Sequence, residues 1–556
     1  MTTRRTSSTI PLILLNSGLA LSLVACAGDD AAGTSDESYG GSATATDGGS
    51  GDTGWGSSSG GSGSASASGG DTAGSTGTSG ATSDSSGGDE TGGEGTTGGE
   101  DPTTGDDSTT GDTTTGGEEV CDDQSPVTLY LSPDDSNSMS SPVQVRETIL
   151  GGWQDYLWGV PIRTWEFFNY YTFEYPAAKP GEVIITPELY RLEEQPEGEY
   201  LLQIGVSSEV ISNENRAPMN ITLVLDESGS MSGPPMEMQK ETCRAIAASL
   251  KVGDIVSMVG WDVQNAVKLA GYKVSGPDDE TLLEKCNALT PGGGTDLHGG
   301  LTAGYDLAHA SYDKDRINRV VLVSDGGANA GITDIDIIAG GAGGNNEDGI
   351  YLVGVGVGSY DTYKDGLMDT VTDAGKGASV FIPSAEEAWK VFNEDFVNTM
   401  AVAVRDVQVK LDMPPGFEIV KFSGEEYSDN PAEIEPQHLA PNDTMVFHQT
   451  IATCAPELIA DDTPITVTAR YKDAITFEQK EIMATVTFGE LLGVESPMVR
   501  KGAAVFAYVE ALDAAKSQTN AAAAKAEAEA RIATAKLLLP TDTDLDEMSA
   551  VLAALQ

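Results

Sequence analysis

The middle of the chain alternates between continuous apolar runs and segments of helical periodicity. Continuous apolar runs are typical of strands in a parallel sheet that is covered on both faces. The predicted strands are Ile221–Asp226, Asp254–Trp261, the edge strand Ala266–Tyr272, Arg319–Asp325, Gly349–Val357 and Ala378–Ile382, and the predicted helices between them are Met236–Leu250, Thr281–Leu289 and Leu297–Ala310. This alternation predicts an α/β domain over residues 218–400, with a doubly wound, mostly parallel sheet.

The pattern changes after residue 400 to a period of two, with turn residues between the runs. The runs are Val407–Met413, Thr444–Thr450, Ile465–Tyr471 and Ile482–Phe488. They predict a β-sandwich-like domain over residues 401–494. A further strand, Leu201–Val206, lies in the N-terminal flanking region 120–217, and if it joins the same sandwich the α/β domain is an insertion. The C-terminal region 495–556 is predicted to be helical, over Pro497–Leu539 and in a short last helix.

The first residues have the pattern of an export signal. Arg4 and Arg5 precede the apolar segment Ile10–Val24, which is shorter than the roughly 20 residues of a membrane span. Small residues then precede Cys26, which resembles a bacterial lipobox. We therefore expect a lipoprotein signal peptide over residues 1–25 and a lipid on Cys26 that anchors the protein to a membrane. An ordinary signal peptide with a chance cysteine is the alternative.

Residues 26–119 consist almost entirely of Gly, Ser, Thr, Ala and acidic residues. Such a composition buries too little apolar area to offset the entropy of ordering, so we expect a disordered tether. Ala27 stands where lipoproteins retained at an inner membrane often carry aspartate. We therefore expect the bacterial cell envelope as the location, at the outer membrane or cell surface rather than the inner membrane. Glycosylation of the tether is left open.

The charge limits the classes of partner, and the number of cysteines indicates disulfides. The formal net charge of −55 argues against nucleic acid and against direct binding to anionic lipid head groups. With Cys26 lipidated, an even number of cysteines remains, which in an exported protein suggests disulfides. Their positions favour the pairs Cys243–Cys286 and Cys121–Cys454. Three connectivities are available to four cysteines, and free thiols remain an alternative.

Candidate chemistry follows the first apolar run. Asp226 ends the predicted strand, and Ser228 and Ser230 follow on a glycine turn. This layout points three hard oxygen ligands at one spot, as Mg²⁺ and similar cations prefer. The alternative is that the two serines only cap the next helix. Glu227 and Asp296 lie beside this stretch, and we expect them to be exposed loop acids.

The stretch resembles the metal-ion-dependent adhesion site (MIDAS) of von Willebrand factor type A (vWA) domains, with its Asp-x-Ser-x-Ser pattern. In such domains a second loop adds a threonine and a third adds an aspartate, which here correspond to Thr295 in Pro291–Leu297 and Asp325 at the end of Arg319–Asp325. The resemblance implies a metal set of Asp226, Ser228, Ser230, Thr295 and Asp325. If it is misleading, Asp325 only starts a turn.

Further segments are similar to the YfbK-like family of bacterial vWA lipoproteins. They are Arg163–Pro176, the Asp-Gly-x-x-Asn-x-Gly turn at Asp325–Gly331, and Gly354–Phe381. The long tether and the cysteines depart from that family. The resemblance implies binding of Mg²⁺, or of Mn²⁺ or Ca²⁺, with an open position completed by a carboxylate from a partner protein. We expect no enzymatic activity; the alternatives are a structural envelope protein with a non-functional site and a metal-dependent hydrolase.

Overall fold

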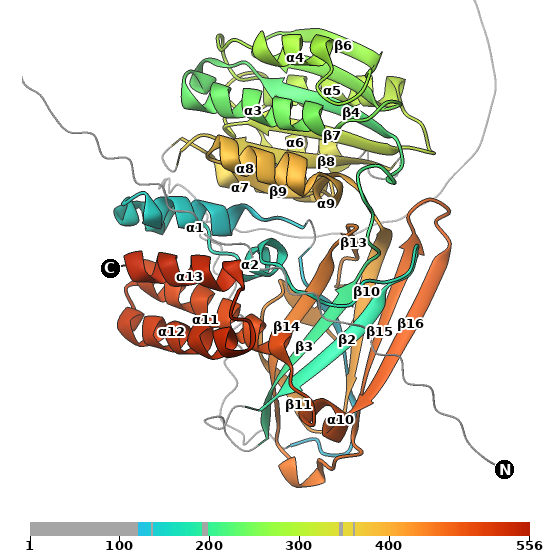
Figure 1. Ribbon diagram of the computed structural model, residues 1–556, viewed down its shortest axis with the longest axis vertical. Helices are drawn as coiled ribbons and strands as arrows, with labels where there is room; N and C mark the ends of the chain where they lie inside the picture. The colour runs from blue at the N-terminus through green and yellow to red at the C-terminus, as the bar shows by residue number, and fades with distance from the viewer. Residues whose placement is uncertain (1–120, 135–136, 192–197, 344–348, 360–361, 556) are drawn as a thin grey trace, which may run out of the picture. The chain divides into compact units, whose positions relative to one another are not determined.

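The structure is a computed structural model that describes residues 121–134, 137–191, 198–343, 349–359 and 362–555. The predicted signal peptide, the lipidation site Cys26 and the tether lie outside these residues. The described residues form a six-stranded α/β sheet, two antiparallel sheets and a layer of helices (Figure 1). No helix among them combines the length and the apolar character that a bilayer crossing requires.

The α/β domain contains one mixed sheet. Its strands are β4 (Met219–Asp226), β5 (Ile255–Trp261), β6 (Asn265–Lys273), β7 (Ile317–Ser324), β8 (Ile350–Val357) and β9 (Ser379–Ile382). In space the order is β6-β5-β4-β7-β8-β9, and only the edge strand β6 runs antiparallel to its neighbour. The predicted doubly wound, mostly parallel sheet is therefore confirmed, and the carboxyl ends of β4 and β7 lie side by side at its centre.

Helices cover both faces of this sheet (Figure 1). One face packs against α3 (Pro234–Ser249), α4 (Glu280–Asn287), α8 (Ala385–Trp389), the π-helical segment η4 (Lys390–Glu394) and α9 (Phe396–Met400). The other face packs against α5 (Leu297–Ala310), α6 (Ile335–Gly343) and α7 (Asp365–Ala374). On β4, Leu223 and Leu225 contact the first set and Val224 the second. Burial on both faces is why most positions of the strand are apolar.

Two antiparallel sheets pack face to face as the predicted sandwich. Their strands are β1 (Val127–Ser132), β2 (Ile184–Tyr190), β3 (Glu199–Ser207), β10 (Val404–Met413), β11 (Phe417–Phe422), β12 (Glu426–Ser428), β13 (Gln437–Leu439), β14 (Thr444–Thr453), β15 (Pro464–Asp473) and β16 (Gln479–Thr487). One sheet has the order β12-β1-β10-β15-β16, with β13 also paired to β10, and the other has the order β11-β14-β3-β2. One apolar core joins them.

The sandwich is built from segments on both sides of the α/β domain. β3 pairs with β14 from Glu199 opposite Ala452 to Ser207 opposite Thr444, as expected for an inserted α/β domain. The division into a separate flanking region 120–217 and a β-rich region 401–494 needs correction. β1 and β3 of the first segment pair with β10 and β14, which both follow residue 400. Their hydrogen-bond partners are too distant in sequence for a local pattern to reveal.

The helical layer combines the predicted C-terminal helices with earlier segments. Its elements are α1 (Ser140–Leu150), the 3₁₀ turn η1 (Gln154–Gly159), α2 (Thr164–Tyr170), α11 (Pro497–Ser517), α12 (Ala521–Leu538) and α13 (Thr543–Ala554). Short turns η2 (Gly229–Met231) and η5 (Pro456–Leu458) and helix α10 (Phe488–Leu492) lie in loops. The helical stretch Pro497–Leu539 is two helices, because Gln518 and Asn520 adopt left-handed backbone angles that end one helix and start the next.

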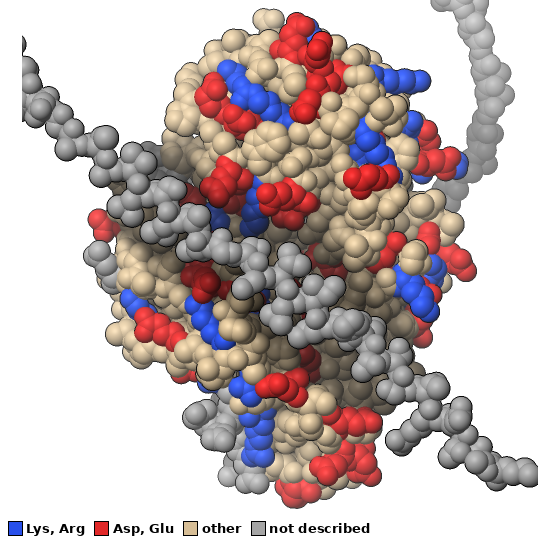
Figure 2. Space-filling model, in the orientation of Figure 1, with Lys and Arg blue, Asp and Glu red and all other residues tan. Residues whose placement is uncertain are grey.

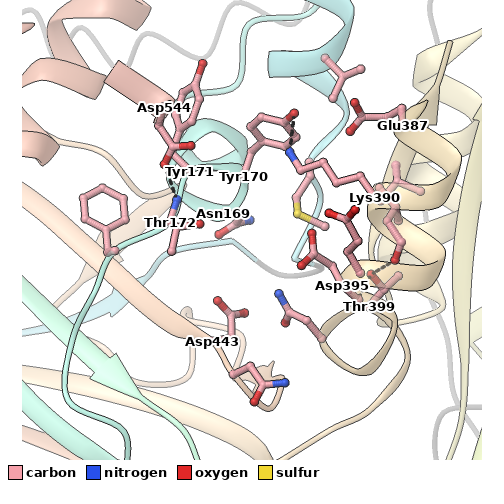
Figure 3. A pocket seen from close by; sticks show the side chains of 18 of the residues that line it. Asn169, Tyr170, Tyr171, Thr172, Glu387, Lys390, Asp395, Thr399, Asp443 and Asp544 are labelled. Atoms are coloured by element: carbon pink, nitrogen blue, oxygen red, sulfur yellow. Dashed lines mark hydrogen bonds between the residues drawn. The ribbon is translucent and has the colours of Figure 1, made fainter. Parts of the chain in front are cut away.

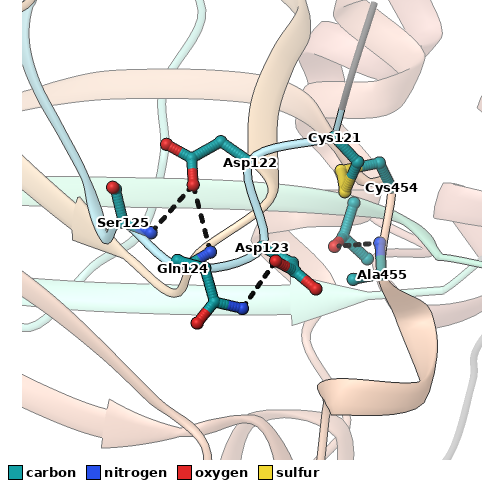
Figure 4. The surroundings of a disulfide bond; sticks show 8 residues. Cys121, Asp122, Asp123, Gln124, Ser125, Cys454 and Ala455 are labelled. Carbon is teal, nitrogen blue, oxygen red and sulfur yellow. Dashed lines mark hydrogen bonds between the residues drawn. A yellow bond between two sulfur atoms is a disulfide. The ribbon is translucent and has the colours of Figure 1, made fainter.

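Both predicted disulfide pairs are present. Cys243 of α3 is joined to Cys286 of α4, and both side chains are buried. Cys121 is joined to Cys454, at the end of β14 (Figure 4). The Cα atoms of each pair lie 5.8 Å apart. The second disulfide therefore fixes the first described residue to the sandwich, next to the point where the predicted tether ends.

Acidic side chains are spread over the surface. The chain has 86 Asp and Glu against 31 Lys and Arg. On the face shown in Figure 2, acidic side chains occur over the α/β domain, the helices and the sandwich, and basic side chains lie among them. This excess of negative charge acts on solubility and association rather than on the choice of fold.

Candidate functional site

The predicted metal ligands meet at the carboxyl ends of β4 and β7. Asp226 is the last residue of β4 and has no exposed surface, and Asp325 directly follows β7 and is 3 % exposed. Parallel strands bring these ends together, as expected for a doubly wound sheet. Burial raises the pKa of Asp226 to about 6, and the nearby charge of Asp325 acts in the same direction. Among the described residues, neither carboxylate has a Lys or Arg partner.

The first loop holds its side chains through local hydrogen bonds. The Ser228 backbone N–H donates to Asp226 Oδ1 over 2.8 Å, and the hydroxyls of Ser228 and Ser230 are 3.0 Å apart. Ser228 is buried, whereas Ser230 is exposed. Neither serine caps α3, whose N-cap is Gly233 and lacks a side-chain cap hydrogen bond. The capping alternative therefore does not account for these hydroxyls.

The second loop places Thr295 at the same spot. Thr295 is 1 % exposed, and its backbone N–H donates to Asn329 Oδ1 over 2.9 Å. A side chain added at Gly327 would contact both Asp325 Oδ1 and Thr295 Cγ2, so these two residues border the same space. The third loop thus supports the threonine loop through Asn329, which belongs to the Asp-Gly-x-x-Asn-x-Gly turn noted in the sequence.

Two glycines of this turn are required by close packing. Gly326 has φ +79°, and a Cβ there would lie 2.5 Å from the Lys364 carbonyl oxygen. Gly331 has φ +66°, and a Cβ there would lie 2.1 Å from Asp296 Oδ1. Backbone with positive φ favours glycine because it has no Cβ. The turn that carries Asp325 therefore depends on both glycines.

The two acids beside the site form contacts that stabilise the loops around it. Glu227 forms an ion pair with Lys268, with 2.7 Å between Oε2 and Nζ, and its side chain is 14 % exposed. Asp296 caps α5 by accepting from the Gly299 N–H over 3.0 Å. The expectation that they are exposed loop acids is wrong, because both are partly buried and hydrogen-bonded. Glu227 already has a cationic partner, whereas Asp226 and Asp325 have none among the described residues.

The tertiary structure adds residues that the motif does not contain. Ser324 Oγ donates to Asp226 Oδ2 over 2.7 Å, and Gln239 Nε2 donates to the Asp226 carbonyl oxygen over 2.8 Å. Both hold Asp226 in position. The sequence contained one signal for Ser324, because it is a polar residue directly before Asp325 at the end of a buried strand. Gln239 lies on the buried side of α3, and only the contact itself identifies its role.

The donor set suits a hard cation rather than a soft one. Within the described part of the chain, no group of three or more His, Cys, Asp or Glu is placed to hold a metal ion. The five predicted ligands contain two carboxylates and three hydroxyls, so they form a site only if hydroxyl oxygens take part. Carboxylate and neutral oxygen ligands are typical of Mg²⁺ and Ca²⁺. Two buried carboxylates without a cationic side chain therefore fit a divalent cation.

A separate cavity of about 480 Å³ lies between α2, η4 and the loop before β14 (Figure 3). Arg146 of α1 pairs with Glu387 of α8 over 2.7 Å and with Glu547 of α13 over 3.2 Å. Burial raises the pKa of Asp443 to about 6, and the charge of Asp395 adds to this effect. None of the predicted metal ligands lines this cavity, and its ion pairs link helices of different segments.

Comparison with known proteins identifies the domain that holds the site. The family profile described as von Willebrand factor type A domain matches residues 221–328. Residues 221–328 belong to a vWA domain. The match runs from the start of the first apolar run to the loop after Asp325, so it includes all five predicted ligands.

Relatives extend the similarity beyond this segment. The uncharacterized protein YfbK of Escherichia coli is 25 % identical over 267 residues, which are 46 % of this chain and 45 % of that protein. The uncharacterized protein sll0103 of Synechocystis is 24 % identical over 220 residues, 40 % of this chain and 51 % of that protein. The chain thus spans about half the length of these relatives, and the predicted YfbK-like vWA protein is confirmed.

A solved structure is similar to part of the chain. The von Willebrand factor type A protein from Catenulispora acidiphila is 18 % identical, with 68 % of this chain and 91 % of that chain covered and a TM-score of 0.42. The vWA assignment here comes from the profile match and the sheet order. A vWA domain supports a role in protein interaction or adhesion.

Proposed function

We propose that the vWA domain binds one divalent cation, Mg²⁺ or else Mn²⁺ or Ca²⁺, and uses it to bind a partner protein through a carboxylate. The observation that carries the proposal is the pair of buried carboxylates, Asp226 and Asp325, without a cationic side chain among the described residues. Buried charges are costly unless they are paired or coordinate a metal. A cation at this spot offsets that cost.

The residues that would hold the cation are Asp226, Ser228, Ser230, Thr295 and Asp325. A bound cation supplies a positive centre that attracts an oxygen anion. Ser324 and the Ser228 N–H each use one lone pair of the Asp226 carboxylate and leave others available. The exposed Ser230 side chain indicates that the site opens to solvent, where a partner can approach.

The choice of a carboxylate ligand follows from charge and access. A hard divalent cation favours a hard, negatively charged oxygen ligand, and Asp or Glu is the common source on a protein surface. We further propose that the protein acts at the bacterial cell envelope, held by a lipid on Cys26. The acid-rich segment 26–119 then separates the vWA domain from the membrane.

The test is calorimetric titration of MgCl₂, MnCl₂ and CaCl₂ into the full chain. We expect one binding site that is lost in Asp226→Asn, which keeps the side-chain shape and removes the charge. Glu227→Gln is the matched control, because it removes an adjacent acid that already pairs with Lys268. Equal metal binding by wild type and Asp226→Asn would refute the proposed ligand set.

The partner step needs its own measurement. The full chain, immobilised in Mg²⁺, is expected to retain an envelope protein that EDTA releases and that Asp226→Asn fails to retain. Retention that persists in EDTA and in Asp226→Asn would place the binding surface elsewhere. Metal binding without any metal-dependent retention would support the structural alternative.

A further inference from the structure

A second cavity lies at the opposite end of the vWA strands from the metal site. Its volume is about 520 Å³, which falls within the roughly 300–1,000 Å³ of small-molecule pockets. It is lined at the start of β7 by Arg319, at the start of β8 by Tyr351, and just inside β10 by Arg405. The turn between β15 and β16 adds Ile475 and Phe477. The cavity is therefore built jointly by the vWA domain and the sandwich.

The acidic residues that line this cavity already have partners. Glu209 accepts from the Gly181 N–H over 3.0 Å, Asp315 pairs with Lys314 over 2.7 Å, and Asp473 pairs with Lys480 over 3.0 Å. None of these acids is within ion-pair distance of Arg319 or Arg405. The acidic lining therefore does not neutralise the two arginines.

The basic residues divide into paired and unpaired groups. Arg216 pairs with Asp254, and Arg316 pairs with Asp313. Arg319 and Arg405 have no carboxylate within 4.0 Å in the described segments of the chain. In a protein with so large an excess of acidic residues, two arginines of one cavity that lack an acidic partner in the described part of the chain need an explanation.

Both guanidinium groups lie near the Tyr351 ring. The Arg319 guanidinium lies 5.2 Å from the centre of the Tyr351 ring and that of Arg405 lies 4.9 Å from it. Arg319 Nε donates to the Met400 carbonyl over 2.9 Å. Arg405 Nε donates to the Ala474 carbonyl over 2.8 Å, and its Nη1 donates to the Tyr351 hydroxyl. These contacts fix both head groups before any ligand is bound.

The arrangement is electrostatically incomplete. Arg319 is only 6 % exposed. Burial lowers its pKa to about 10, and the positive charge of Arg405 acts in the same direction. A buried charge without a counter-charge costs free energy, and an anion bound in the cavity that both arginines line offsets this cost. Guanidinium groups bind carboxylates and phosphates in a planar, bidentate geometry.

The walls indicate what the anion is attached to. The Phe477 ring lies 4.9 Å from the Arg405 guanidinium and is 54 % exposed, and Ile475 beside it is 67 % exposed. Apolar side chains at the rim favour a ligand that has an apolar body as well as a charged head. Free inorganic anions gain nothing from these contacts.

We propose that this cavity binds a small organic oxyanion, with its charged head at Arg319 and Arg405 and its apolar part against Ile475 and Phe477. Carboxylates and phosphate monoesters share the required head-group chemistry. The proposal does not depend on the metal site, because it involves none of the metal ligands.

The test is calorimetry on the full chain with four probes at physiological salt. Benzoate and phenyl phosphate carry both parts of the ligand, benzamide lacks the charge, and inorganic phosphate lacks the apolar body. We expect benzoate or phenyl phosphate to bind at least about tenfold more tightly than benzamide and inorganic phosphate, since hydrogen bonds to charged groups contribute about 1.5–3 kcal/mol. Comparing benzoate with phenyl phosphate distinguishes the two head groups.

Variants test whether the two arginines, rather than positive charge elsewhere in the cavity, bind the anion. Arg319→Gln and Arg405→Gln are each expected to weaken binding of the tighter probe about tenfold or more. Lys314→Gln is the matched control, since Lys314 lines the same cavity but is 78 % exposed and already paired. Arg405→Gln changes a half-buried side chain, so it decides the question if Arg319→Gln does not fold.

Four results would overturn the proposal. Benzamide binding as tightly as benzoate and phenyl phosphate, or no binding of any probe, excludes an oxyanion site. Unchanged affinity in Arg405→Gln excludes the arginine pair. Inorganic phosphate binding as tightly as phenyl phosphate excludes the contribution of Ile475 and Phe477.

Discussion

The buried ion pair at the entrance to the vWA domain allows a sharp test of what holds this domain together. Arg216 and Asp254 both have side chains with no exposed surface. Two parallel hydrogen bonds of 3.0 and 2.6 Å join them. Asp254 also accepts from the backbone N–H groups of Met219 and Lys251. The pair thus ties the start of β4 to the turn before β5.

Arg216→Met removes the charge and keeps most of the side-chain volume. Asp254 then remains buried with only two backbone donors. Breaking a buried ion pair by removing one partner costs about 3–5 kcal/mol, because the remaining charge is uncompensated. No reduction for solvent screening applies, since both groups are fully buried. We expect a loss of about 4 kcal/mol in the free energy of unfolding.

The assay is urea unfolding of the full chain followed by circular dichroism. Arg316→Gln is the control, because Arg316 pairs with Asp313 at the same end of the domain but these side chains are 20 % and 49 % exposed. An exposed pair contributes about 1 kcal/mol or less. If Arg216→Met and Arg316→Gln lower the free energy of unfolding by the same amount, burial does not set the strength of the ion pair. If Arg216→Met loses less than about 1 kcal/mol, the reasoning fails.

Further predictions concern a disulfide, a buried acid and the lipid. Replacing Cys243 and Cys286 together by alanine opens a cross-link over a sequence separation of 43 and should cost about 4 kcal/mol in urea unfolding; a loss below about 1 kcal/mol would contradict the loop-entropy account. Burial and the Asp395 charge raise the folded-state pKa of Asp443 to about 6, above about 3.9 in unfolded chains, so folding loses stability as the pH rises from 4 to 6. The free energy of unfolding of Asp443→Asn should therefore exceed that of wild type by about 2 kcal/mol at pH 8, a value reduced for the partial exposure of the side chain. This difference should vanish toward pH 4, and a difference that does not depend on pH would refute the reasoning. Radiolabelled fatty acid should be incorporated into the wild-type protein in a bacterial host and not into Cys26→Ser, and labelling of both would exclude Cys26 as the lipidation site.

Much of the vWA domain could be predicted because the amino-acid composition of its strands indicates how deeply they are buried. A strand buried on both faces is apolar throughout, and the predicted helix Leu297–Ala310 has the same bounds as α5. β2 was missed because Pro187 interrupts its pattern. Proline is tolerated there because β2 is an edge strand, where an absent N–H leaves no ladder bond unmade. Edge position is a tertiary property that the local sequence does not contain.

The grouping of the predicted metal ligands could be predicted for a different reason. Asp226, Thr295 and Asp325 each follow a strand or a glycine loop, and parallel strands bring such positions to one edge. The supporting groups were not predictable, because Ser324 and Gln239 act through side-chain contacts with Asp226. A glutamine in a helix has no distinctive pattern, and a serine at the end of a buried strand indicates a polar contact without naming its partner.

The sequence by itself determined which residues with oxygen ligands stand at strand ends, and that the chain is strongly acidic. Apolar periodicity and chain direction are sufficient for these conclusions. Only the tertiary structure decided that segments before and after the vWA domain form one sandwich, and which charges compensate each other. Arg216 has a buried acid whereas Arg319 and Arg405 have none among the described residues. Compensation depends on distances of a few ångström between segments far apart in sequence, and only folding sets those distances.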